Sequence, residues 1–449
     1  MKKKALLSSI LALAICLCLI VGSTYALFTS KSELNVDVSS GTVSVVADLE
    51  NVQLHSVVAD PAGEEEDENG NTYTYVARTD GFFANRGTAV FENSVLTMTN
   101  ITPGDKVSFT LTVANTSNVL AQYRYGIYCT SGQYLMSGMI VTIGGTAYPA
   151  LDHYVTAWDE LDPMEPVADV EISVELPVSA GNEYQSLSTS FYILVEAVQA
   201  NGVVEGDAEI GYISAPDTVE ELKDAINDPN VAYVAVPKDI EGVAEVGDVA
   251  NKIIDAAGNN IALKFTGTMD NVKVMNIVND GAAGTSINLK KATGDITVED
   301  CALVSGSGTG ACAIALGPNA NITLKNSDIS AEGTGKIYGM YNSGPSGSII
   351  VDNCTFSGFT SWAITANSTV NGDVAITNCT FNATSGGVFK TLGGGITGTF
   401  TFTDNTMNCP GHDNDSANLV VSGSNPVVAA GGKTVTGNTL NGADWSQNQ

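Results

Sequence analysis

Six segments in the second half of the chain follow one template, and this repeat constrains the fold more than any other feature. Apolar and polar residues alternate, and then come an Asn or Asp, a small residue, a polar residue and an apolar residue. The segments are VKVMNIV (272–278), ITVEDCALV (296–304), ITLKNSDI (322–329), IIVDNCTF (349–356), VAITNCTF (374–381) and FTFTDNTM (400–407). Each contains one short strand pattern and no helical period. A repeat of this regular length, without a helix, therefore predicts a parallel β-solenoid, in which each coil covers the one before it.

We expect the repeated Asn or Asp to form a structural ladder. Sharp turns between short strands leave backbone N–H and C=O groups that stacked side-chain amides can satisfy in coil after coil. The predicted ladder, with one member in each copy of the template, is Asn276, Asp300, Asn326, Asn353, Asn378 and Asn405. The small residues that follow predict a second stack, either of buried thiols or of a redox or metal site, at Cys301, Ser327, Cys354 and Cys379.

A short amphipathic helix is predicted just before the repeats, in SAPDTVEELKDAINDPN. Asp217 or Thr218 can cap its N-terminus, and Asp228-Pro229 stops it. Because the end of a solenoid needs a polar cap, we assign this role to the helix. The second domain is thus predicted to span residues 214–449.

The first half of the chain has a period of two instead. Val107, Phe109, Leu111 and Val113 alternate with Ser and Thr, and other segments repeat this pattern up to about Tyr212. Strands with one buried face, separated by turns such as TPGDK, predict an antiparallel sandwich over residues 27–213. The acidic segment GEEEDENGN predicts either a solvated hairpin tip or a Ca²⁺-binding loop.

Residues 1–26 have the parts of a signal peptide: three lysines, an apolar run and small residues before a cleavage site after Ala26. The apolar run, from Ala5 to Val21, is shorter than the roughly 20 residues that a retained membrane anchor, the alternative, needs. We therefore expect a secreted or cell-surface protein without membrane contact after signal removal. The formal net charge of −30, with no basic stripe, argues against nucleic-acid binding.

A strand pattern follows the predicted cleavage site almost at once. Leu34, Val36 and Val38 alternate with Asn35 and Asp37. Such a strand either completes the sheet of a neighbouring subunit, through main-chain pairing and alternate side-chain pockets, or folds into its own sheet. We assign Leu34, Val36 and Val38 as a candidate assembly strand.

The first domain resembles the TasA/camelysin family of exported proteins of Gram-positive bacteria. The resemblance covers roughly residues 28–205 and rests on GSTYALFTSKSELNVDVSSGTVSV, LTMTNITPGDKVSFTLTVANTSNVLAQY and SFYILVEAVQANG. It implies a jelly-roll-like sandwich, secretion and, in some members, fibres in which each N-terminal strand completes the next subunit's sheet. Camelysin-like proteins have also been classed as metallopeptidases, but His55, His153 and His412 are isolated, so no His-Glu-x-x-His zinc site is present.

The second domain resembles the pectate-lyase-like superfamily through DTVEELKDAINDPNVAYVAVPKDI and the Asn-bearing coils that follow. The resemblance implies a right-handed parallel β-helix. Arginine-dependent lyase chemistry is disfavoured because residues 216–449 contain no arginine. A hydrolase would need two carboxylates flanking the scissile bond. The coil acids are Asp295, Glu299, Asp300, Asp352, Asp373 and Asp404, of which Asp352 and Asp373 could lie on neighbouring coils.

The sequence thus predicts an all-β, exported structural or adhesive protein of the cell surface or biofilm matrix, assembling with itself. The alternative is a β-helix protein that binds or degrades an extracellular glycan. Aromatic residues in the loops between strands could stack on sugar rings or fill the core: Tyr338, Tyr341, Phe359 and Trp362. No catalytic residue, metal or cofactor is predicted.

Overall fold

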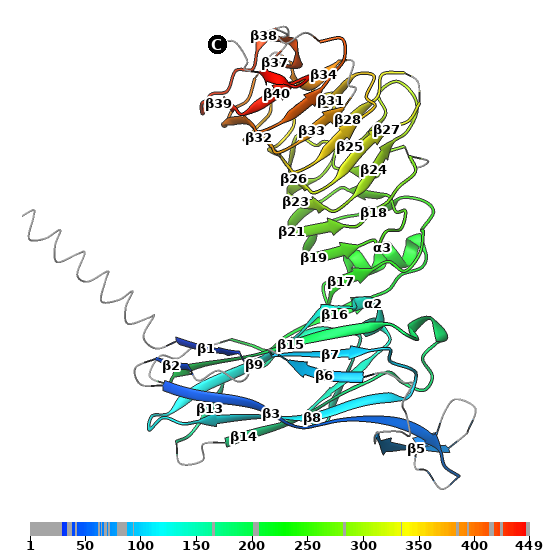
Figure 1. The fold of residues 1–449 in the computed structure, drawn as a ribbon, viewed down its shortest axis with the longest axis vertical. Helices are drawn as coiled ribbons and strands as arrows, with labels where there is room; N and C mark the ends of the chain where they lie inside the picture. Colours follow the sequence, from blue (N-terminus) through cyan, green and yellow to red (C-terminus); the bar gives the residue numbers. More distant parts are fainter. Residues whose placement is uncertain are drawn as a thin grey trace, which may run out of the picture. The chain divides into compact units, whose positions relative to one another are not determined.

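The computed structural model describes most of the chain after residue 28 (Figure 1). The described residues are 29–33, 38–40, 43–61, 63, 65–66, 70, 72–78, 88–92, 94–163, 167–200, 206–281, 284–333, 335–382, 386–392, 395–412, 417–422 and 425–445. They form two compact units, the first ending at Ile213 and the second beginning at Ser214. Among the described residues no helix is long and apolar enough to cross a membrane.

The first unit contains two antiparallel sheets. In one, β8 (Asp105–Asn115) lies between β3 (Val43–Ala59) and β14 (Val167–Glu175). The remaining strands of this sheet are β2 (Val38–Ser40), β4 (Glu65–Glu66), β5 (Thr72–Ala77), β10 (Ile140–Ile143) and β11 (Thr146–Pro149). Alternate residues of β8 are buried, as the period of two predicts.

The second sheet is centred on β15 (Ser188–Gln199), which pairs along its length with β9 (Ala121–Ser131). Its other strands are β1 (Thr29–Glu33), β6 (Thr88–Glu92), β7 (Val95–Thr99), β12 (Leu151–Val155), β13 (Asp159–Leu161) and β16 (Glu209–Ser214). A helix, α2 (Gln133–Ser137), and a 3-10 turn, η1 (Asn182–Tyr184), interrupt the strands. The core between the sheets includes Leu111 and Ile193, both fully buried.

The TPGD turn before β8 is fixed by a buried carboxylate. Asp105 is fully buried, and its Oδ2 accepts hydrogen bonds from the backbone N–H and the hydroxyl of Thr102, both at 2.9 Å. The Ser56 hydroxyl donates to Oδ1. Gly104 has φ +87°, and a Cβ there would lie 2.3 Å from Val57 Cγ2, so the turn requires glycine.

The second unit begins with the predicted helix, α3 (Val219–Asn227). The Thr218 hydroxyl accepts the Glu221 N–H at 3.2 Å, and Leu222 and Ile226 are buried. The N-cap is therefore Thr218, one of the two candidates from the sequence.

Three stacks of parallel strands follow, and successive coils add one strand at a time to each stack. The first stack is β17 (Val231–Ala235), β19 (Val249–Asp255), β21 (Thr268–Met275), β23 (Thr293–Glu299), β26 (Asn319–Lys325), β29 (Ile349–Asp352), β32 (Val374–Thr377), β35 (Phe400–Thr403) and β39 (Lys433–Thr436). The second is β18 (Ala244–Val246), β20 (Leu263–Phe265), β22 (Ile287–Asn288), β25 (Cys312–Ala315), β28 (Tyr338–Asn342), β31 (Trp362–Ala366), β34 (Gly387–Thr391) and β37 (Val420–Ser422). The third is β24 (Ala302–Ser305), β27 (Asp328–Ala331), β30 (Thr355–Ser357), β33 (Thr380–Asn382), β36 (Thr406–Asn408) and β40 (Asn438–Leu440). The predicted fold class, an antiparallel sandwich followed by a parallel β-helix, is confirmed.

The last coil of the β-helix ends in reversed strands. A 3-10 turn, η2 (Ala417–Leu419), precedes β37, and β38 (Asn425–Pro426) then pairs with β37 antiparallel. Likewise β41 (Ala443–Trp445) runs back along β40. The buried Trp445 ring meets Phe402 edge-on at 5.9 Å between centroids, so an aromatic side chain closes this end of the core.

Candidate functional site

Five of the six predicted ladder residues have a left-handed backbone conformation, and their side chains are not buried. Asn276, Asp300, Asn326, Asn353 and Asn378 have φ between +50° and +58°, and their side chains are exposed or half-buried. Of L-residues, Asn and Asp adopt this conformation most readily. The turn therefore selects these residues for their backbone and not, as predicted, to satisfy buried backbone groups.

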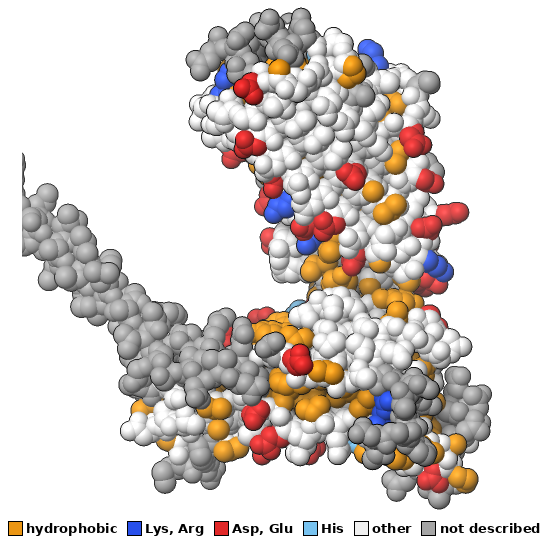
Figure 2. All heavy atoms as spheres, viewed as in Figure 1, with side chains coloured by type: hydrophobic (Ala, Val, Ile, Leu, Met, Phe, Trp, Pro, Cys, Tyr) orange, Lys and Arg blue, Asp and Glu red, His pale blue; other side chains and the backbone are white. Residues whose placement is uncertain are grey.

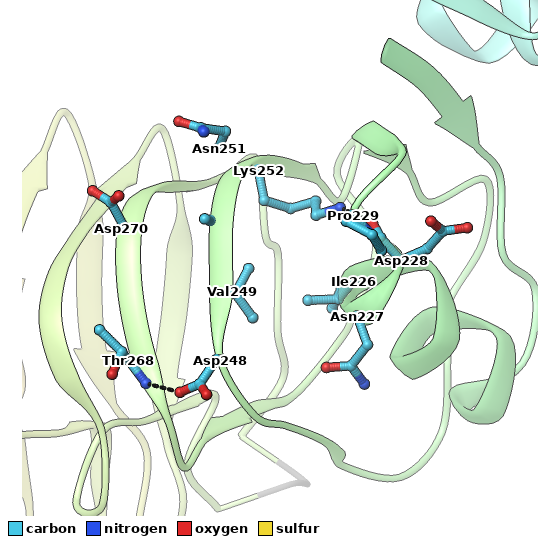
Figure 3. A pocket seen from close by; sticks show the side chains of 11 residues that line it. Ile226, Asn227, Asp228, Pro229, Asp248, Val249, Asn251, Lys252, Thr268 and Asp270 are labelled. Carbon is cyan, nitrogen blue, oxygen red and sulfur yellow. Dashed lines mark hydrogen bonds between the residues drawn. The ribbon is translucent and has the colours of Figure 1, made fainter. Parts of the chain in front are cut away.

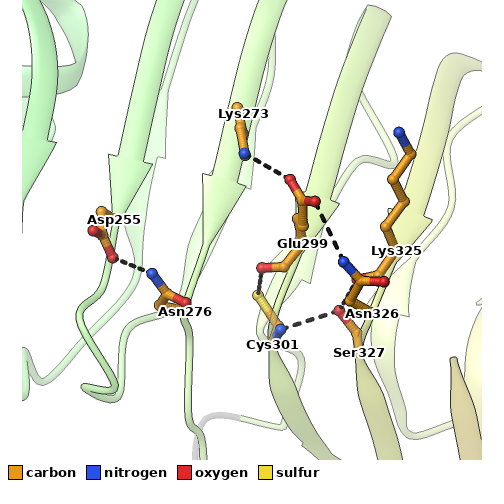
Figure 4. Close-up of polar contacts among 8 residues, drawn as sticks. All are labelled: Asp255, Lys273, Asn276, Glu299, Cys301, Lys325, Asn326 and Ser327. Atoms are coloured by element: carbon orange, nitrogen blue, oxygen red, sulfur yellow. Dashed lines mark hydrogen bonds and ion pairs between the residues drawn. The ribbon is translucent and has the colours of Figure 1, made fainter. Parts of the chain in front are cut away.

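Their side chains form an outer row whose hydrogen bonds vary from coil to coil (Figure 4). Asn276 Nδ2 donates to Asp255 at 2.9 Å, whereas Asn326 Nδ2 lies 3.5 Å from Glu299. A direct amide-to-amide bond joins Asn353 to Asn326, at 2.9 Å. In the sixth copy the left-handed residue is Asp404, at φ +56°, so Asn405 is one position out of the predicted row.

Asn405 belongs instead to a buried stack at the next position, which we name the inner ladder: Cys301, Ser327, Cys354, Cys379, Asn405 and Asn438. The Cys301 thiol and the Ser327 hydroxyl each donate to the carbonyl two residues earlier, at 3.2 and 2.7 Å. Asn405 Oδ1 accepts the Cys379 N–H at 2.9 Å, and its Nδ2 donates to the Ile376 carbonyl at 2.9 Å. The inner ladder thus satisfies the backbone groups that the sequence analysis assigned to the outer row.

The Cys301 thiol of the inner ladder has the properties of a buried, protonated group. Burial raises the pKa of Cys301 to about 12. No disulfide joins the described cysteines, and no group of three or more His, Cys, Asp or Glu side chains in the described ranges could hold a metal ion. Of the three histidines, His153 Nδ1 lies 2.9 Å from the neighbouring carboxylate of Asp152.

The candidate assembly strand is described only in part. Leu34 and Val36 lie outside the described residues, and Val38 begins β2, where it pairs with Val45 of β3. Just upstream, β1 pairs antiparallel with the second half of β15, placing Thr29 opposite Val198 and Glu33 opposite Leu194. Strand β7 takes the first half of the same edge, opposite residues 188–192. The first described strand therefore fills the remaining part of an edge that β7 leaves open.

The coil carboxylates do not form the close pair that a hydrolase needs. Asp352 ends β29, whereas Asp373 precedes β32, whose first residue Val374 pairs with the first residue of β29, Ile349. Hydrogen bonds from the Thr377 hydroxyl and the Asn378 amide lower the pKa of Asp352. The N–H and hydroxyl of Thr399 lower the pKa of Asp373. Both shifts oppose the raised pKa of a general acid.

The remaining predicted acids serve other contacts. Glu299 forms an ion pair with Lys273 at 2.6 Å, shown in Figure 4, and Asp295 accepts a hydrogen bond from Asn321 at 2.8 Å. Asp300 and Asp404 occupy left-handed turn positions. These placements make the four residues parts of the turns and of the outer surface.

Three of the four candidate aromatic residues lie together on the outer face of the second stack, on strands and not in the predicted loops. Tyr338 and Tyr341 of β28 stack with centroids 4.3 Å apart. Trp362 begins β31, and Lys390 Nζ of β34 lies 5.3 Å from its ring centroid. Phe359 is buried in the core and is unavailable to a ligand.

A pocket of about 400 Å³ lies beside helix α3 (Figure 3). Asp228, Asp248, Asp270 and the buried Lys252 line it. Lys252 Nζ donates to the carbonyl of Asp228, the C-cap of α3, at 2.6 Å, and to the carbonyl of Val231, the first residue of β17, so it binds backbone oxygens of the segment that joins the helix to the first strand. Burial lowers the pKa of Lys252. These contacts explain Lys252 as a structural cap, a role that the sequence alone does not indicate.

The charged surface of the β-helix is dispersed. On the face seen in Figure 2, acidic side chains are scattered over a surface that is largely uncharged, and basic side chains stand among them. Several acidic groups are paired, including Glu245 with Lys264 at 2.6 Å.

No protein-family model matches the chain, and no curated protein matches it. Among solved structures, the chain is similar to the catalytic domain of a GH87 alpha-1,3-glucanase variant in complex with tetrasaccharides, at 10% sequence identity and a TM-score of 0.20. The match covers 79% of this chain and 74% of that chain. A similarity of this size carries no argument about function.

Proposed function

We propose that the protein is an exported structural or adhesive component of the cell surface or biofilm matrix, of the TasA/camelysin type, which assembles by exchanging its N-terminal strand. The observation that carries this proposal is the place of β1. It begins shortly after the predicted cleavage site and fills the part of the β15 edge that β7 leaves open.

Strand exchange needs no new interface. If β1 leaves its own β15 and pairs with that of another copy, the same main-chain bonds form between chains. The exposed edge left behind, residues 194–198, accepts the β1 of a further copy. If each copy donates its strand to a new copy, the exchanges continue as an open-ended chain; if two copies exchange strands reciprocally, they close into a dimer. Cleavage of the signal peptide would free the strand to move.

A cross-strand disulfide distinguishes exchange from folding within one chain. Ser30 lies opposite Ala197 in the β1–β15 register. In a Cys129→Ser background, Ser30→Cys combined with Ala197→Cys should cross-link the purified mature protein under mild oxidation, since neighbouring strands bring Cα atoms within disulfide range. Covalent multimers on a non-reducing gel support exchange.

A product consisting only of cross-linked monomers, at high protein concentration, places β1 in its own sheet and refutes assembly by this strand. The two variants that carry only one of the new cysteines serve as matched controls, because the five other cysteines of the β-helix are buried in the folded chain. They form dimers at most and cannot give a ladder of larger species.

A second candidate function, contact with an extracellular glycan, is supported by the aromatic residues of the second stack. Tyr341, Thr365 and Lys390 are in register on neighbouring coils. In this row Tyr341 and Lys390 are half-buried, whereas Thr365 between them is buried. Aromatic rings offer flat apolar surfaces to the apolar faces of sugars, and a lysine donates hydrogen bonds to their oxygens.

Affinity electrophoresis in gels containing alginate or dextran tests this second function. Binding at the aromatic face predicts retardation of the wild type that is lost in Trp362→Ala and Tyr341→Ala. Tyr134→Ala, which removes a ring from the Tyr134–Tyr184 pair of the sandwich, is the matched control and should leave retardation unchanged. Equal mobility of wild type and variants in both gels would refute it.

A further inference from the structure

Cys354 and Cys379 occupy equivalent positions on neighbouring coils. In the strand register, Asp352 pairs with Thr377 and Thr355 pairs with Thr380, so these two pairs bracket the cysteines on both sides. The two cysteines have the same separation in sequence as the bracketing pairs, and both belong to the inner ladder. Their backbones are thus separated by roughly the distance between neighbouring strands, about 4.8 Å. This lies within the Cα separations of disulfides, about 4.4 to 6.8 Å.

The two side chains point the same way into the core. Cys354 is 3% exposed and Cys379 is 1% exposed. Cys354 Sγ donates to the Asp352 carbonyl at 3.2 Å, and Cys379 Sγ donates to the Thr377 carbonyl at 3.0 Å. Cys379 Sγ also lies 3.8 Å from the carbonyl of Val351 on the preceding coil, and Cys354 Sγ lies 3.7 Å from that of Leu324, so the two thiols are held in the same orientation. Cys301, by contrast, has Ser327 as its neighbour in the inner ladder.

We propose that Cys354 and Cys379 are a redox site that forms a disulfide between coils when the chain folds in the presence of a small-molecule disulfide. The thiolate of one cysteine attacks the small disulfide, forms a mixed disulfide and releases one small thiol. The second thiolate attacks the protein sulfur of that mixed disulfide and releases the other small thiol. Two protein thiols are oxidised and one small disulfide is reduced to two thiols.

The reaction belongs to the folding chain and not to the native state. Burial excludes the oxidant from both sulfurs, and the hydrogen bond with Cys379 together with burial raises the pKa of Cys354. A thiol held protonated is a poor nucleophile. Once formed, the bond closes a loop of one complete coil. It disfavours the unfolded chain and ties together the two coils that it joins.

The experiment is refolding of the full mature chain from denaturant in oxidised and reduced glutathione. We expect the intact mass to fall by the two hydrogens lost, a linked peptide pair containing Cys354 and Cys379, and Cys301 still open to alkylation after denaturation. The melting temperature of the β-helix should rise by roughly 10 °C relative to the fully reduced protein. Cys354→Ser and Cys379→Ser should each abolish the mass change and the melting shift, whereas Cys301→Ser should leave both unchanged.

The proposal is overturned if all cysteines remain alkylatable after oxidative refolding, if the linked peptides contain another cysteine, or if the linked protein melts lower than the reduced one. Export, part of the proposed function, would supply the oxidising surroundings. The glutathione experiment does not depend on export or on strand exchange, so its failure leaves those proposals standing, and their failure leaves this one standing.

Discussion

Replacing Asn405 by leucine should destabilise the β-helix far more than the same change at Asn353, although the two residues come from equivalent turns. The Asn405 side chain is 1% exposed and makes hydrogen bonds to Cys379, Ile376 and Asn438. Leucine has a similar volume, so no large cavity forms, but the buried N–H of Cys379 loses its acceptor. The carbonyl of Ile376 loses a donor at the same time.

Each buried polar group left unpaired costs about 1 to 3 kcal/mol, so Asn405→Leu should cost about 3 kcal/mol. At Asn353 the amide is exposed and water replaces its bond to Asn326. The cost there is the strain of a branched residue at φ +52°, about 1 kcal/mol. Glycine keeps this order and widens the difference: Asn353→Gly relieves strain and should be nearly neutral, whereas Asn405→Gly loses the same hydrogen bonds as leucine.

Urea unfolding followed by tryptophan fluorescence measures these differences. In a Trp158→Phe background the remaining tryptophans, Trp362 and Trp445, both report on the β-helix. A cost at Asn353→Leu equal to that at Asn405→Leu, or a neutral Asn405→Gly, would show that the division into an outer row and an inner ladder is wrong.

Four further predictions concern the sandwich, the charges and export. Asp105→Ala should destabilise the sandwich by about 3 kcal/mol in thermal unfolding, because three donors lose a buried acceptor. The pKa of Asp352 is lowered in the folded chain, so its ionised carboxylate stabilises the β-helix above about pH 4, and this stabilisation is lost as the pH falls through the folded pKa. Asp352→Asn should therefore weaken the fall in the free energy of unfolding at acid pH, measured by urea unfolding at a series of pH values. Burial lowers the pKa of Lys252 in the folded chain, so between the folded pKa and the unfolded pKa of about 10.4 the unfolded chain binds more protons than the folded one. The free energy of unfolding should therefore rise with pH in this range, and Lys252→Met should remove the rise. Protein sequencing of secreted material should begin at Leu27, and an intact Met1 found only in membranes would contradict the signal peptide.

The repeat predicted the β-helix because period and strand pattern are set by local chemistry. Alternate apolar residues of each copy are buried, as at Ile322 and Leu324. Helix α3 was predictable because an N-cap and a proline stop mark its ends. These signals lie within a short stretch of sequence, so they can be recognised without knowing which residues pack against it.

The error at Asn405 has a specific physical origin. Asp404 and Asn405 are adjacent and are both residues of the Asn/Asp class, but in FTFTDNTM Asp404 holds the fifth position of the template, the exposed left-handed one, and Asn405 holds the buried position after it. The roles of Lys252 and Lys390 depend on residues far away in the sequence, so no local pattern reveals them. The sequence predicted loops for these aromatic residues because their strands are short. How far a side chain on such a strand is covered depends on the neighbouring coils, which no local pattern describes.

The reversed strands at the end of the β-helix affect how such a domain can change in length over evolution. Strands β38 and β41 and the Trp445 ring finish the last coil, while α3 finishes the first. Duplication of one repeat between these ends, for instance the coil that runs from Asn353 to Asn378, inserts a rung whose two faces match its neighbours. The domain then grows by about 4.8 Å without alteration of either terminus. Unequal recombination can therefore change the length of the β-helix by whole coils.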